Sequence, residues 1–333
     1  MTTATMRALV VDAANTAFVS RSLPRPEPRA GEVLVKIHAS AVNPLDTKIR
    51  SGNAAHARHP FPAVLGMDLA GVVEAIGADV DGLRVGDEVY GLTGGVGGLQ
   101  GSLAEYAAVD AALLAIKPAN LSMREAAALP LITITAWEGL VDRADTHAGQ
   151  TVLVHGGAGG VGHVAVQLAR ARGAAVFATV RSGQFDIARR FGATPIDYES
   201  TSVEQYVAQH TAGEGFDVIY DTVGGATLDA SFGAVRPYGG HVVSCLGWGT
   251  HKLAPLSFRA ATYSGVFTLI PMLTGKGRAN HGHILREATR LVEAGQLVPL
   301  VDPRRYTLDT ALQAHVEVEN GHANGKIVVD VAG

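Results

Sequence analysis

The amino-acid sequence predicts an α/β protein in which a doubly wound parallel sheet follows a β-rich first domain. From residue 151 to about 246, apolar runs alternate with helix-like segments, and this alternation is typical of a parallel sheet with helices on both faces. Residues 6–126 instead contain short apolar runs broken by Pro and Gly, which favours an irregular β-barrel. At 333 residues the chain is long enough for two domains.

A glycine-rich loop opens the α/β part of the chain. Val152–Val154 predicts a strand, His155–Gly162 has the sequence HGGAGGVG, and a helix is expected from there to Arg172. Ala174–Thr179 then predicts the second strand of the same unit. A chain with 40 glycines could contain such a pattern by chance, but the flanking strands and helix favour a dinucleotide site.

We expect the glycines of this loop to serve different purposes. Gly157 would make the tight turn after the strand, Gly159 would let the backbone approach a pyrophosphate, and Gly162 would let the helix pack closely on the strand. The free amides and the dipole at the helix N-terminus favour a bound anion. The predicted ligand contacts of the loop are Gly157, Gly159, Gly160, Val161 and Gly162.

The remaining elements continue the alternation of strand and helix. Ser122 is expected to cap a helix over Met123–Leu140, with Glu125 completing a capping box, and the domain boundary is placed here. The later predicted helices are Gln184–Phe191, Ser202–His210, Gly225–Val235 and Gly282–Gly295, and the later predicted strands are Thr194–Asp197, Phe216–Asp221, His241–Leu246, Tyr263–Ile270 and Gly325–Val331.

Composition excludes several classes of function. The net charge is -4 and charged residues make up 17% of the chain, so nothing favours binding to nucleic acid or to an anionic membrane. The single cysteine, Cys245, excludes an internal disulfide and a four-cysteine zinc lobe, and we expect it to be a small buried residue rather than a nucleophile. No secretory signal and no apolar run of about 20 residues is evident, so a cytoplasmic location is expected.

Motifs spread along nearly the whole chain resemble those of one enzyme superfamily. They are Ala41–Asp46 with Arg50–Gly52, Gly66–Asp68 leading into Ala70–Val73, Val85–Val89, the glycine loop, and Asn324–Val329. In this order they resemble the medium-chain dehydrogenase/reductase superfamily and, within it, the zinc-independent quinone oxidoreductases related to zeta-crystallin. The resemblance implies a GroES-like β-barrel domain at 1–126 and 298–333, a Rossmann nucleotide-binding domain at 127–297, and an active site in the cleft between them.

The resemblance also implies that no metal takes part in the reaction. Zinc-dependent relatives have a cysteine where this chain has Asn43 or its neighbours, a histidine where it has Met67, and a third ligand near Leu131. A catalytic zinc needs three protein ligands, and these positions do not supply them. Without a Lewis acid to polarise an alcohol, we expect reduction of an already electrophilic substrate rather than alcohol oxidation.

The end of the second strand favours NADPH as the cofactor. An acidic residue at this place binds the ribose hydroxyls of NAD, whereas the 2′-phosphate of NADP needs cationic or hydrogen-bonding groups. Thr179–Gly183 contains no acid and offers Arg181 and Ser182. The family's tyrosine near the third strand corresponds to Tyr198, while Gln184 stands where relatives often have a lysine. A solvated loop arginine is the alternative interpretation of Arg181.

For the reaction, the resemblance implies hydride transfer from NADPH to a quinone or to the β-carbon of an enone or enal. It places among the cofactor-binding residues Thr135, Thr222, Leu246 and Asn324. Asn43 and Asp46 are the candidate catalytic residues that would position substrate and nicotinamide. A turn-forming role is the alternative for both, because Asn-Pro sequences favour turns. No general acid is identified, so solvent is expected to supply the proton.

Three classes of function remain open from the sequence. They are an NADPH-dependent reductase of quinones or activated alkenes, an NADPH-binding structural or regulatory protein with little turnover, and an S-adenosylmethionine-dependent transferase. The third is least favoured, because the barrel motifs ahead of the glycine loop would then have no purpose. We also expect a homodimer that extends the sheet through the apolar run Tyr263–Ile270.

Overall fold

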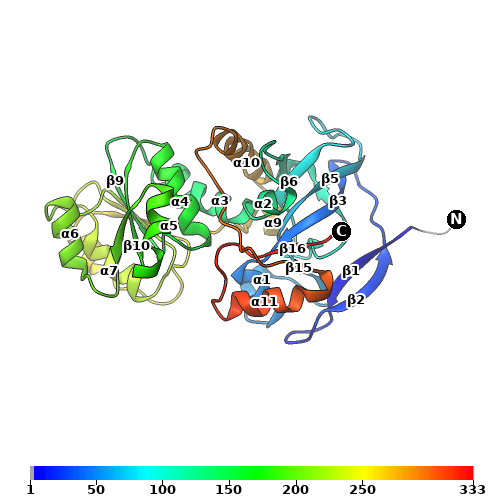
Figure 1. Ribbon diagram of the computed structural model, residues 1–333, viewed down its shortest axis with the longest axis horizontal. Coiled ribbons are helices and arrows are strands. Elements are labelled where there is room, and N and C mark those ends of the chain that lie inside the picture. The colour runs from blue at the N-terminus through cyan, green and yellow to red at the C-terminus, as the bar shows by residue number, and fades with distance from the viewer. Residues whose placement is uncertain (1–3, 333) are drawn as a thin grey trace. The chain divides into compact units, whose positions relative to one another are not determined.

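The computed structural model describes residues 4–332, which divide into two compact units (Figure 1). The barrel unit comprises the residues up to Leu131, the segment Leu269–Gly295 and the residues from Pro299 onward. The Rossmann unit comprises Ile132–Thr268 and Gln296–Val298. The first and the last described residues therefore belong to the barrel unit, and the Rossmann unit is inserted between its segments. Among residues 4–332, no helix has both the length and the apolar character needed to cross a lipid bilayer.

The segment Leu269–Gly295 groups with the barrel unit, whereas the sequence-based limits assign it to the nucleotide-binding domain. Its helix α10 (Arg278–Glu293) packs on strand β8 (Leu114–Ile116). The Tyr90 hydroxyl donates a hydrogen bond to the Leu285 carbonyl oxygen of this helix at 2.7 Å. This packing, which the periodicity of a single helix does not reveal, accounts for the difference.

The Rossmann unit is built on one sheet of six parallel strands in the order β11-β10-β9-β12-β13-β14. The strands are β9 (Thr151–His155), β10 (Ala175–Val180), β11 (Thr194–Asp197), β12 (Val218–Asp221), β13 (His241–Ser244) and β14 (Thr262–Gly265). The first of them, β9, lies between β10 and β12, so the chain builds the sheet outward first on one side and then on the other. Ligands of such sheets typically bind outside the carboxyl ends of the strands at this switch point.

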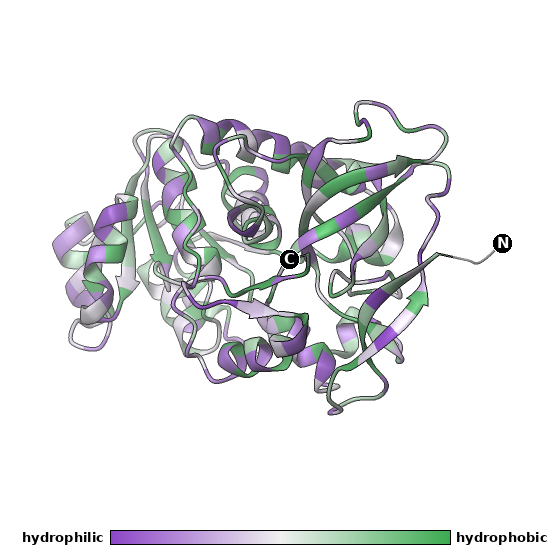
Figure 2. Ribbon diagram, turned by 45° about the vertical axis from the view of Figure 1, so that its right-hand side comes forward, coloured by the Kyte–Doolittle hydropathy of each residue, from purple (hydrophilic) through white to green (hydrophobic). Residues whose placement is uncertain are grey.

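Helices connect the successive strands of the Rossmann sheet (Figure 1). They are α4 (Gly160–Ala171), α5 (Phe185–Phe191), α6 (Val203–Thr211), α7 (Ala226–Ala234) and α8 (Ala254–Ser257). A buried apolar cluster joins the sheet to α6, α7 and α8, and it includes Leu153, Tyr206, Ile219, Phe232 and Leu256. Figure 2 shows hydrophobic residues concentrated on the strands and hydrophilic residues frequent on the helices. The burial of apolar side chains is the main favourable contribution to such a core.

The long helix expected after Ser122 is in fact three shorter helical segments. They are α2 (Met123–Ala127), α3 (Pro130–Trp137) and the π-helical segment η3 (Glu138–Arg143). The break falls at Pro130, because proline lacks the amide hydrogen of a helix interior but fits the first turn of a new helix. The capping box predicted at Ser122 is present.

The strand expected at Tyr263–Ile270 is shorter than the sequence suggests. Strand β14 ends at Gly265, and Ile270 begins helix α9 (Ile270–Thr274). Pro271 lies in the first turn of this helix, where its fixed backbone angle is favourable. The apolar run is therefore half edge strand and half connection to the helix.

The barrel unit is organised around the long strand β3 (Glu32–Ala41). This strand pairs antiparallel with β5 (Asp68–Ile76), with β7 (Tyr106–Asp110) and with β16 (Val328–Asp330) from the far end of the chain. The remaining elements are β1 (Thr5–Val11), β2 (Val19–Pro24), β4 (Ala63–Val64), β6 (Glu88–Leu92), β15 (Tyr306–Thr307), α1 (Pro44–Arg50) and α11 (Ala311–Glu319). The pairing of β16 with β3 brings the last segment of the chain next to the start of α1.

Candidate functional site

The glycine loop joins β9 to α4 at the switch point of the sheet. Gly156 has a φ of 70°, in the left-handed region that glycine tolerates, so Gly156 makes the turn after the strand. Gly157 follows it in the same turn, which the Gly159 amide closes by donating to the Gly156 carbonyl oxygen at 2.8 Å, so the turn expected at Gly157 is present and begins one residue earlier. A Cβ on Gly157 would lie 2.4 Å from the Ala178 Cβ, so this glycine is needed for close packing of the loop on β10.

The start of α4 lies against the loop, as we expected for Gly162. A Cβ on Gly162 would lie 2.0 Å from the Gly156 carbonyl oxygen, so a larger residue does not fit. Gly159 is the N-cap, and the amides of Gly160, Val161 and Gly162 lie in the first turn, where a helix offers its amides no acceptor. These amides and the helix dipole favour an anion such as a pyrophosphate.

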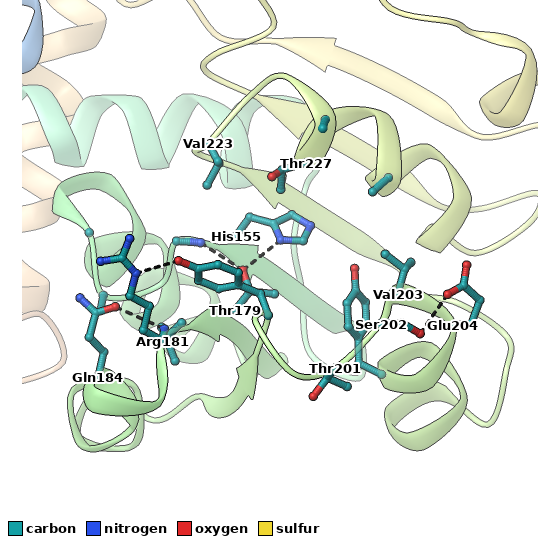
Figure 3. A pocket seen from close by; sticks show the side chains of 18 residues that line it. His155, Thr179, Arg181, Gln184, Thr201, Ser202, Val203, Glu204, Val223 and Thr227 are labelled. Atoms are coloured by element: carbon teal, nitrogen blue, oxygen red, sulfur yellow. Dashed lines mark hydrogen bonds between the residues drawn. The ribbon is translucent and has the colours of Figure 1, made fainter.

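A cavity of about 700 Å³ lies beside the loop, entirely within the Rossmann unit (Figure 3). Its walls come from the glycine loop, the ends of β9 and β10, the segment after β11, and the start of α7. The residues that line it are His155, Gly156, Ala158, Gly159, Thr179, Val180, Arg181, Gln184, Tyr198, Thr201, Ser202, Val203, Glu204, Tyr206, Val223, Ala226, Thr227 and Ala230. A cavity of this size accommodates a small-molecule ligand.

Arg181 and Tyr198 come together at this cavity. Each residue directly follows one of the adjacent parallel strands β10 and β11. The Arg181 Nε donates a hydrogen bond to the Tyr198 hydroxyl at 3.0 Å (Figure 3). The same Nε lies 3.6 Å from the Glu199 carboxylate, and the Arg181 side chain is largely exposed. The guanidinium is therefore available to an anionic ligand, although one acid is close to it.

Three of the other predicted cofactor residues lie outside the lining of this cavity. Ser182 begins the helical turn η4 after Arg181 and is exposed. The Thr222 hydroxyl donates to the His155 carbonyl oxygen at 2.6 Å. The Thr135 carbonyl oxygen accepts from the Tyr220 hydroxyl at 2.7 Å. Both threonines therefore tie neighbouring elements of the Rossmann unit together.

The last two predicted cofactor residues are Leu246 and Asn324. The Leu246 amide donates to the Ser244 hydroxyl at 3.0 Å just after β13. Asn324 belongs to the barrel unit, where its amide donates to the Asp302 carboxylate at 2.8 Å. Of the predicted loop contacts, Gly159 lines the cavity, whereas Gly157, Gly160, Val161 and Gly162 do not.

Several polar residues that line the cavity were not predicted from the sequence, and four of them illustrate why. His155 and Thr179 lie at the carboxyl ends of β9 and β10, and this position in a parallel sheet was a readable signal. Ser202 and Thr227 come from the starts of α6 and α7. Their approach to the loop depends on how these helices pack, for which the sequence offers no local signal.

A second group of polar residues lies buried within the barrel unit, around Asn43. The Asn43 side-chain amide donates to Asp68 Oδ2 at 2.9 Å, and its backbone amide donates to Asp46 Oδ2 at 2.8 Å. The Lys326 ammonium donates to the Asn43 side-chain oxygen and, at 3.1 Å, to the Val42 carbonyl oxygen. The same ammonium lies 3.7 Å from Asp68 Oδ2. We call Asn43, Asp46, Asp68 and Lys326 the buried cluster.

Burial dominates the electrostatics of the buried cluster. It raises the pKa of Asp46 to about 7, against the opposing effect of the hydrogen bond from Asn43. It also raises the pKa of Asp68 and lowers the pKa of Lys326, in each case against the attraction between these two groups. Within the described part of the chain, Asp46 Oδ1 has no hydrogen-bond partner. One cation thus accompanies two carboxyl groups, and Asp46 can carry a proton near neutral pH.

Asn43 of the buried cluster, Met67 and Leu131 are the positions at which the resemblance places the metal ligands of zinc-dependent relatives. The Asn43 side chain is bonded to Asp68 and Lys326. Met67 is fully buried, and the Leu131 amide donates to Asp68 Oδ1 at 2.9 Å. Across residues 4–332, no group of three or more His, Cys, Asp or Glu residues is arranged to hold a metal ion. The donor set at these positions does not fit a catalytic zinc, which needs three protein ligands.

Comparisons with known proteins agree with this architecture. Residues 29–119 match the family described as the alcohol dehydrogenase GroES-like domain, and residues 191–329 match the family described as zinc-binding dehydrogenase. A curated relative, the 2-methylene-furan-3-one reductase of Solanum lycopersicum, is 38% identical over 91% of this chain and 73% of its own length. The chloroplastic NADPH-dependent alkenal/one oxidoreductase of Arabidopsis thaliana is 36% identical over the same shares.

Solved structures give the same result. An alcohol dehydrogenase superfamily protein from Novosphingobium aromaticivorans is 59% identical, with a TM-score of 0.96 over 98% of this chain and 100% of that chain. The quinone oxidoreductase from Coxiella burnetii is 28% identical, with a TM-score of 0.83 over 99% of this chain and 100% of that chain.

The GroES-like barrel and the Rossmann unit with its glycine loop define a nicotinamide-dependent oxidoreductase. The chain belongs to the medium-chain dehydrogenase/reductase superfamily, next to quinone and enone reductases. It is accordingly an enzyme that uses NADH or NADPH and acts on a small molecule.

Proposed function

We propose that this enzyme uses NADPH to reduce an α,β-unsaturated carbonyl compound or a quinone, without a catalytic zinc. The choice of NADPH depends on the Arg181 and Tyr198 pair at the cavity and on the lack of an acid in Thr179–Gly183. A guanidinium and a phenol hydroxyl both suit a 2′-phosphate. Two relatives support the substrate class, because their names include an alkenal/one oxidoreductase and a furanone reductase.

Different residues of the chain would bind different parts of NADPH. When bound, NADPH supplies the hydride, which adds to an electrophilic carbon of the substrate while a proton from solvent completes the reduction. The first-turn amides of α4, from Gly160 to Gly162, would hold the pyrophosphate. Arg181 would hold the 2′-phosphate, with Tyr198 fixing the orientation of its guanidinium.

Asn43 and Asp46 have a narrower role in this proposal than the sequence suggests. The Asn43 amide donates one of its two hydrogens to Asp68, so we propose that Asn43 acts mainly by orienting the buried cluster. Asp46 retains one oxygen without a partner in the described chain and has a pKa of about 7. We propose that Asp46, in its protonated or ionised form, helps to position the substrate or the nicotinamide.

The absence of zinc from the mechanism has its own test. Because the side chains of Asn43, Met67 and Leu131 do not make a zinc site, chelation of metals should leave the activity unchanged. Metal analysis of the purified enzyme should show less than stoichiometric zinc. A loss of activity with a chelator that zinc restores would contradict this part of the proposal.

Oxidation of NADPH tests the reaction itself. The absorbance of the reduced nicotinamide should fall when the enzyme is given members of a panel of enones, enals and quinones, and it should fall more slowly with NADH. The second candidate is a protein that binds NADPH with little turnover. Tight binding of NADPH without oxidation across the whole panel would favour that second candidate and overturn the first.

We also propose a homodimer formed through the free edge of the Rossmann sheet. Strand β14 is the last strand in the sheet order, and an unpaired edge invites pairing. Near it, Tyr238 and Phe258 are each 89% exposed, and the Tyr238 amide donates to the Arg259 carbonyl oxygen at 2.8 Å. Sedimentation of the wild-type enzyme should give a dimer, and Phe258→Asp should weaken it. A stable wild-type monomer at micromolar concentration would contradict the dimer.

A further inference from the structure

His155 is a buried histidine in the wall of the cavity that the proposed function does not yet use. It is the last residue of β9, and its side chain is almost entirely removed from solvent, with 3% exposed. The ring lies in the cavity between Thr179 and the segment that carries Val223 and Thr227 (Figure 3). A ligand in this cavity therefore comes within reach of the ring.

The hydrogen bonds of Thr179 favour one position for the proton of the His155 ring. The Thr179 hydroxyl oxygen accepts from the Gly156 amide at 3.3 Å and lies 3.0 Å from His155 Nδ1. A hydroxyl has one hydrogen to donate, and Nδ1 is the acceptor available to it here. We assign the hydrogen of the ring to Nε2 on this basis.

The other nitrogen, Nε2, is buried and lacks a partner among the described residues. Buried polar atoms without a hydrogen bond are rare in folded proteins, and each one calls for an explanation. Burial also lowers the pKa of His155 to about 4, against the raising effect of Asp221. The ring is therefore neutral at physiological pH, and Nε2 holds a single hydrogen that points to no acceptor in the protein.

The surroundings of the ring indicate which part of a dinucleotide would supply the acceptor. The glycine loop binds the pyrophosphate in the proposed function, and Arg181 with Tyr198 binds the 2′-phosphate. The ribose of the adenosine joins these two groups in NADPH, and the adenine base projects from that ribose. The side chains of Val203, Val223 and Ala226 add apolar walls to the same cavity, which suits a flat base.

We propose that His155 is a cofactor-binding residue whose Nε2 hydrogen is donated to an oxygen or nitrogen acceptor of the bound adenosine. Thr179 is the positioning residue, because its hydroxyl fixes both the ring and the site of the proton. This inference rests on the proposed function only for where the dinucleotide lies in the cavity. The choice between NADPH and NADH does not affect it, because both contain the same adenosine. It does not depend on the substrate that is reduced.

The test measures binding of ADP-ribose, which contains the adenosine and pyrophosphate but not the nicotinamide, by calorimetry. His155→Leu should weaken binding about tenfold, the effect of losing one hydrogen bond. His155→Gln retains an amide donor near the place of Nε2 and should bind within about threefold of wild type. His155→Asn has its amide near the place of Nδ1 and should bind as weakly as the Leu variant.

Stability without ligand separates binding from a structural role. His155→Leu loses the bond between Nδ1 and the Thr179 hydroxyl and should lower the Tm of the free enzyme modestly, whereas the loss of the Nε2 donor shows as a smaller Tm increase on adding ADP-ribose. If the Leu variant does not fold, the Gln and Asn variants still differ from each other in ADP-ribose affinity. Thr179→Val should also weaken binding several-fold, since the ring is no longer held.

Several outcomes would overturn the inference. One is that the Leu variant binds ADP-ribose as tightly as wild type does. Another is that the Gln and Asn variants lose the same amount of affinity for ADP-ribose. The third is that Thr179→Val binds ADP-ribose with unchanged affinity. Failure of the proposed reaction gives a different result, because wild type would then bind ADP-ribose and depend on His155 without oxidising NADPH on any substrate of the panel.

Discussion

The Lys326 ammonium lies 3.7 Å from the Asp68 carboxylate inside the barrel unit, although the two residues are near opposite ends of the sequence. Both side chains are almost fully buried. A buried ion pair contributes little net stability, but removal of one partner leaves an uncompensated charge. The structure therefore makes the barrel unit sensitive to loss of either group.

Lys326→Met should destabilise the barrel unit strongly. Loss of the cation leaves Asp68 and Asp46 without a counter-charge, and breaking such a buried pair costs about 3–5 kcal/mol. Thermal unfolding of the variant should show a much lower Tm for the barrel unit. The double variant Lys326→Met with Asp68→Asn should recover part of this loss, and a single variant as stable as wild type would show that the pair is dispensable.

Asp46→Asn should change how stability depends on pH. The pKa of Asp46 in the folded protein is about 7, above its value of about 4 in an unfolded chain, so the folded state binds the proton more tightly. This preference contributes stability that is present below pH 4 and is lost as the pH rises through 7. The loss is on the order of 4 kcal/mol for a shift of this size.

The comparison of wild type with Asp46→Asn isolates this group from the other titrating residues. The Asn side chain retains an oxygen that can accept from the Asn43 amide. The variant should gain stability relative to wild type between pH 5 and pH 8, as measured by denaturant unfolding. A difference that stays constant over this range would show that Asp46 titrates normally.

Arg181→Ala should raise the KM for NADPH about tenfold or more and leave the KM for NADH nearly unchanged. The reason is that the guanidinium would contact the 2′-phosphate, which NADH lacks, and hydrogen bonds to charged groups are the stronger ones. Arg190→Ala is a suitable control, because Arg190 is an exposed arginine of α5 that does not line the cavity. Equal effects of Arg181→Ala on both cofactors would remove Arg181 from the cofactor site.

Gly162→Ala should disrupt the glycine loop. The added Cβ would lie 2.0 Å from the Gly156 carbonyl oxygen, and accommodating it costs about 1–3 kcal/mol. We expect a lower Tm and weaker NADPH binding. Gly233→Ala in α7 is the matched control, because a Cβ at Gly233 meets nothing within 4 Å.

In that control, replacement of a helical glycine by alanine should stabilise the protein by about 0.5–1 kcal/mol. If both variants were equally stable, the close packing of α4 on the loop would be less strict than the geometry indicates.

Much of the Rossmann unit and of the helix that precedes it could be predicted from sequence, because the signals are local. The capping box at Ser122, the strand Thr194–Asp197 and the helix that follows Ser202 are all present within one or two residues of the expected positions. The turn after β9 was expected at Gly157 and includes it, but its positive φ is at Gly156, which the order of the glycines does not show. The two glycines differ in the structure, because Gly156 has the positive φ, whereas Gly157 packs closely on Ala178.

The sites were harder to predict, because their contacts join distant parts of the chain. Asn43 and Asp46 were singled out from one motif, but their partners Asp68, at the start of β5, and Lys326, just before β16, were not. His155 was assigned only to the loop, because its unpartnered nitrogen depends on the hydroxyl of Thr179 in the neighbouring strand. Burial and pairing across strands decide such cases, and no spacing along the sequence encodes them.

Strand β16 pairs with β3 and follows Lys326. Its late position in the chain affects the order in which the two units can fold during synthesis on the ribosome. The Rossmann unit ends at Val298, so its chain is complete before Lys326 is synthesised. Until then, Asp46 and Asp68 have no ammonium beside them and β3 has an unpaired edge. We expect the Rossmann unit to fold first during synthesis and the barrel to close last. A chain truncated before Lys326 should therefore yield a protease-resistant Rossmann fragment and a barrel that is readily cleaved.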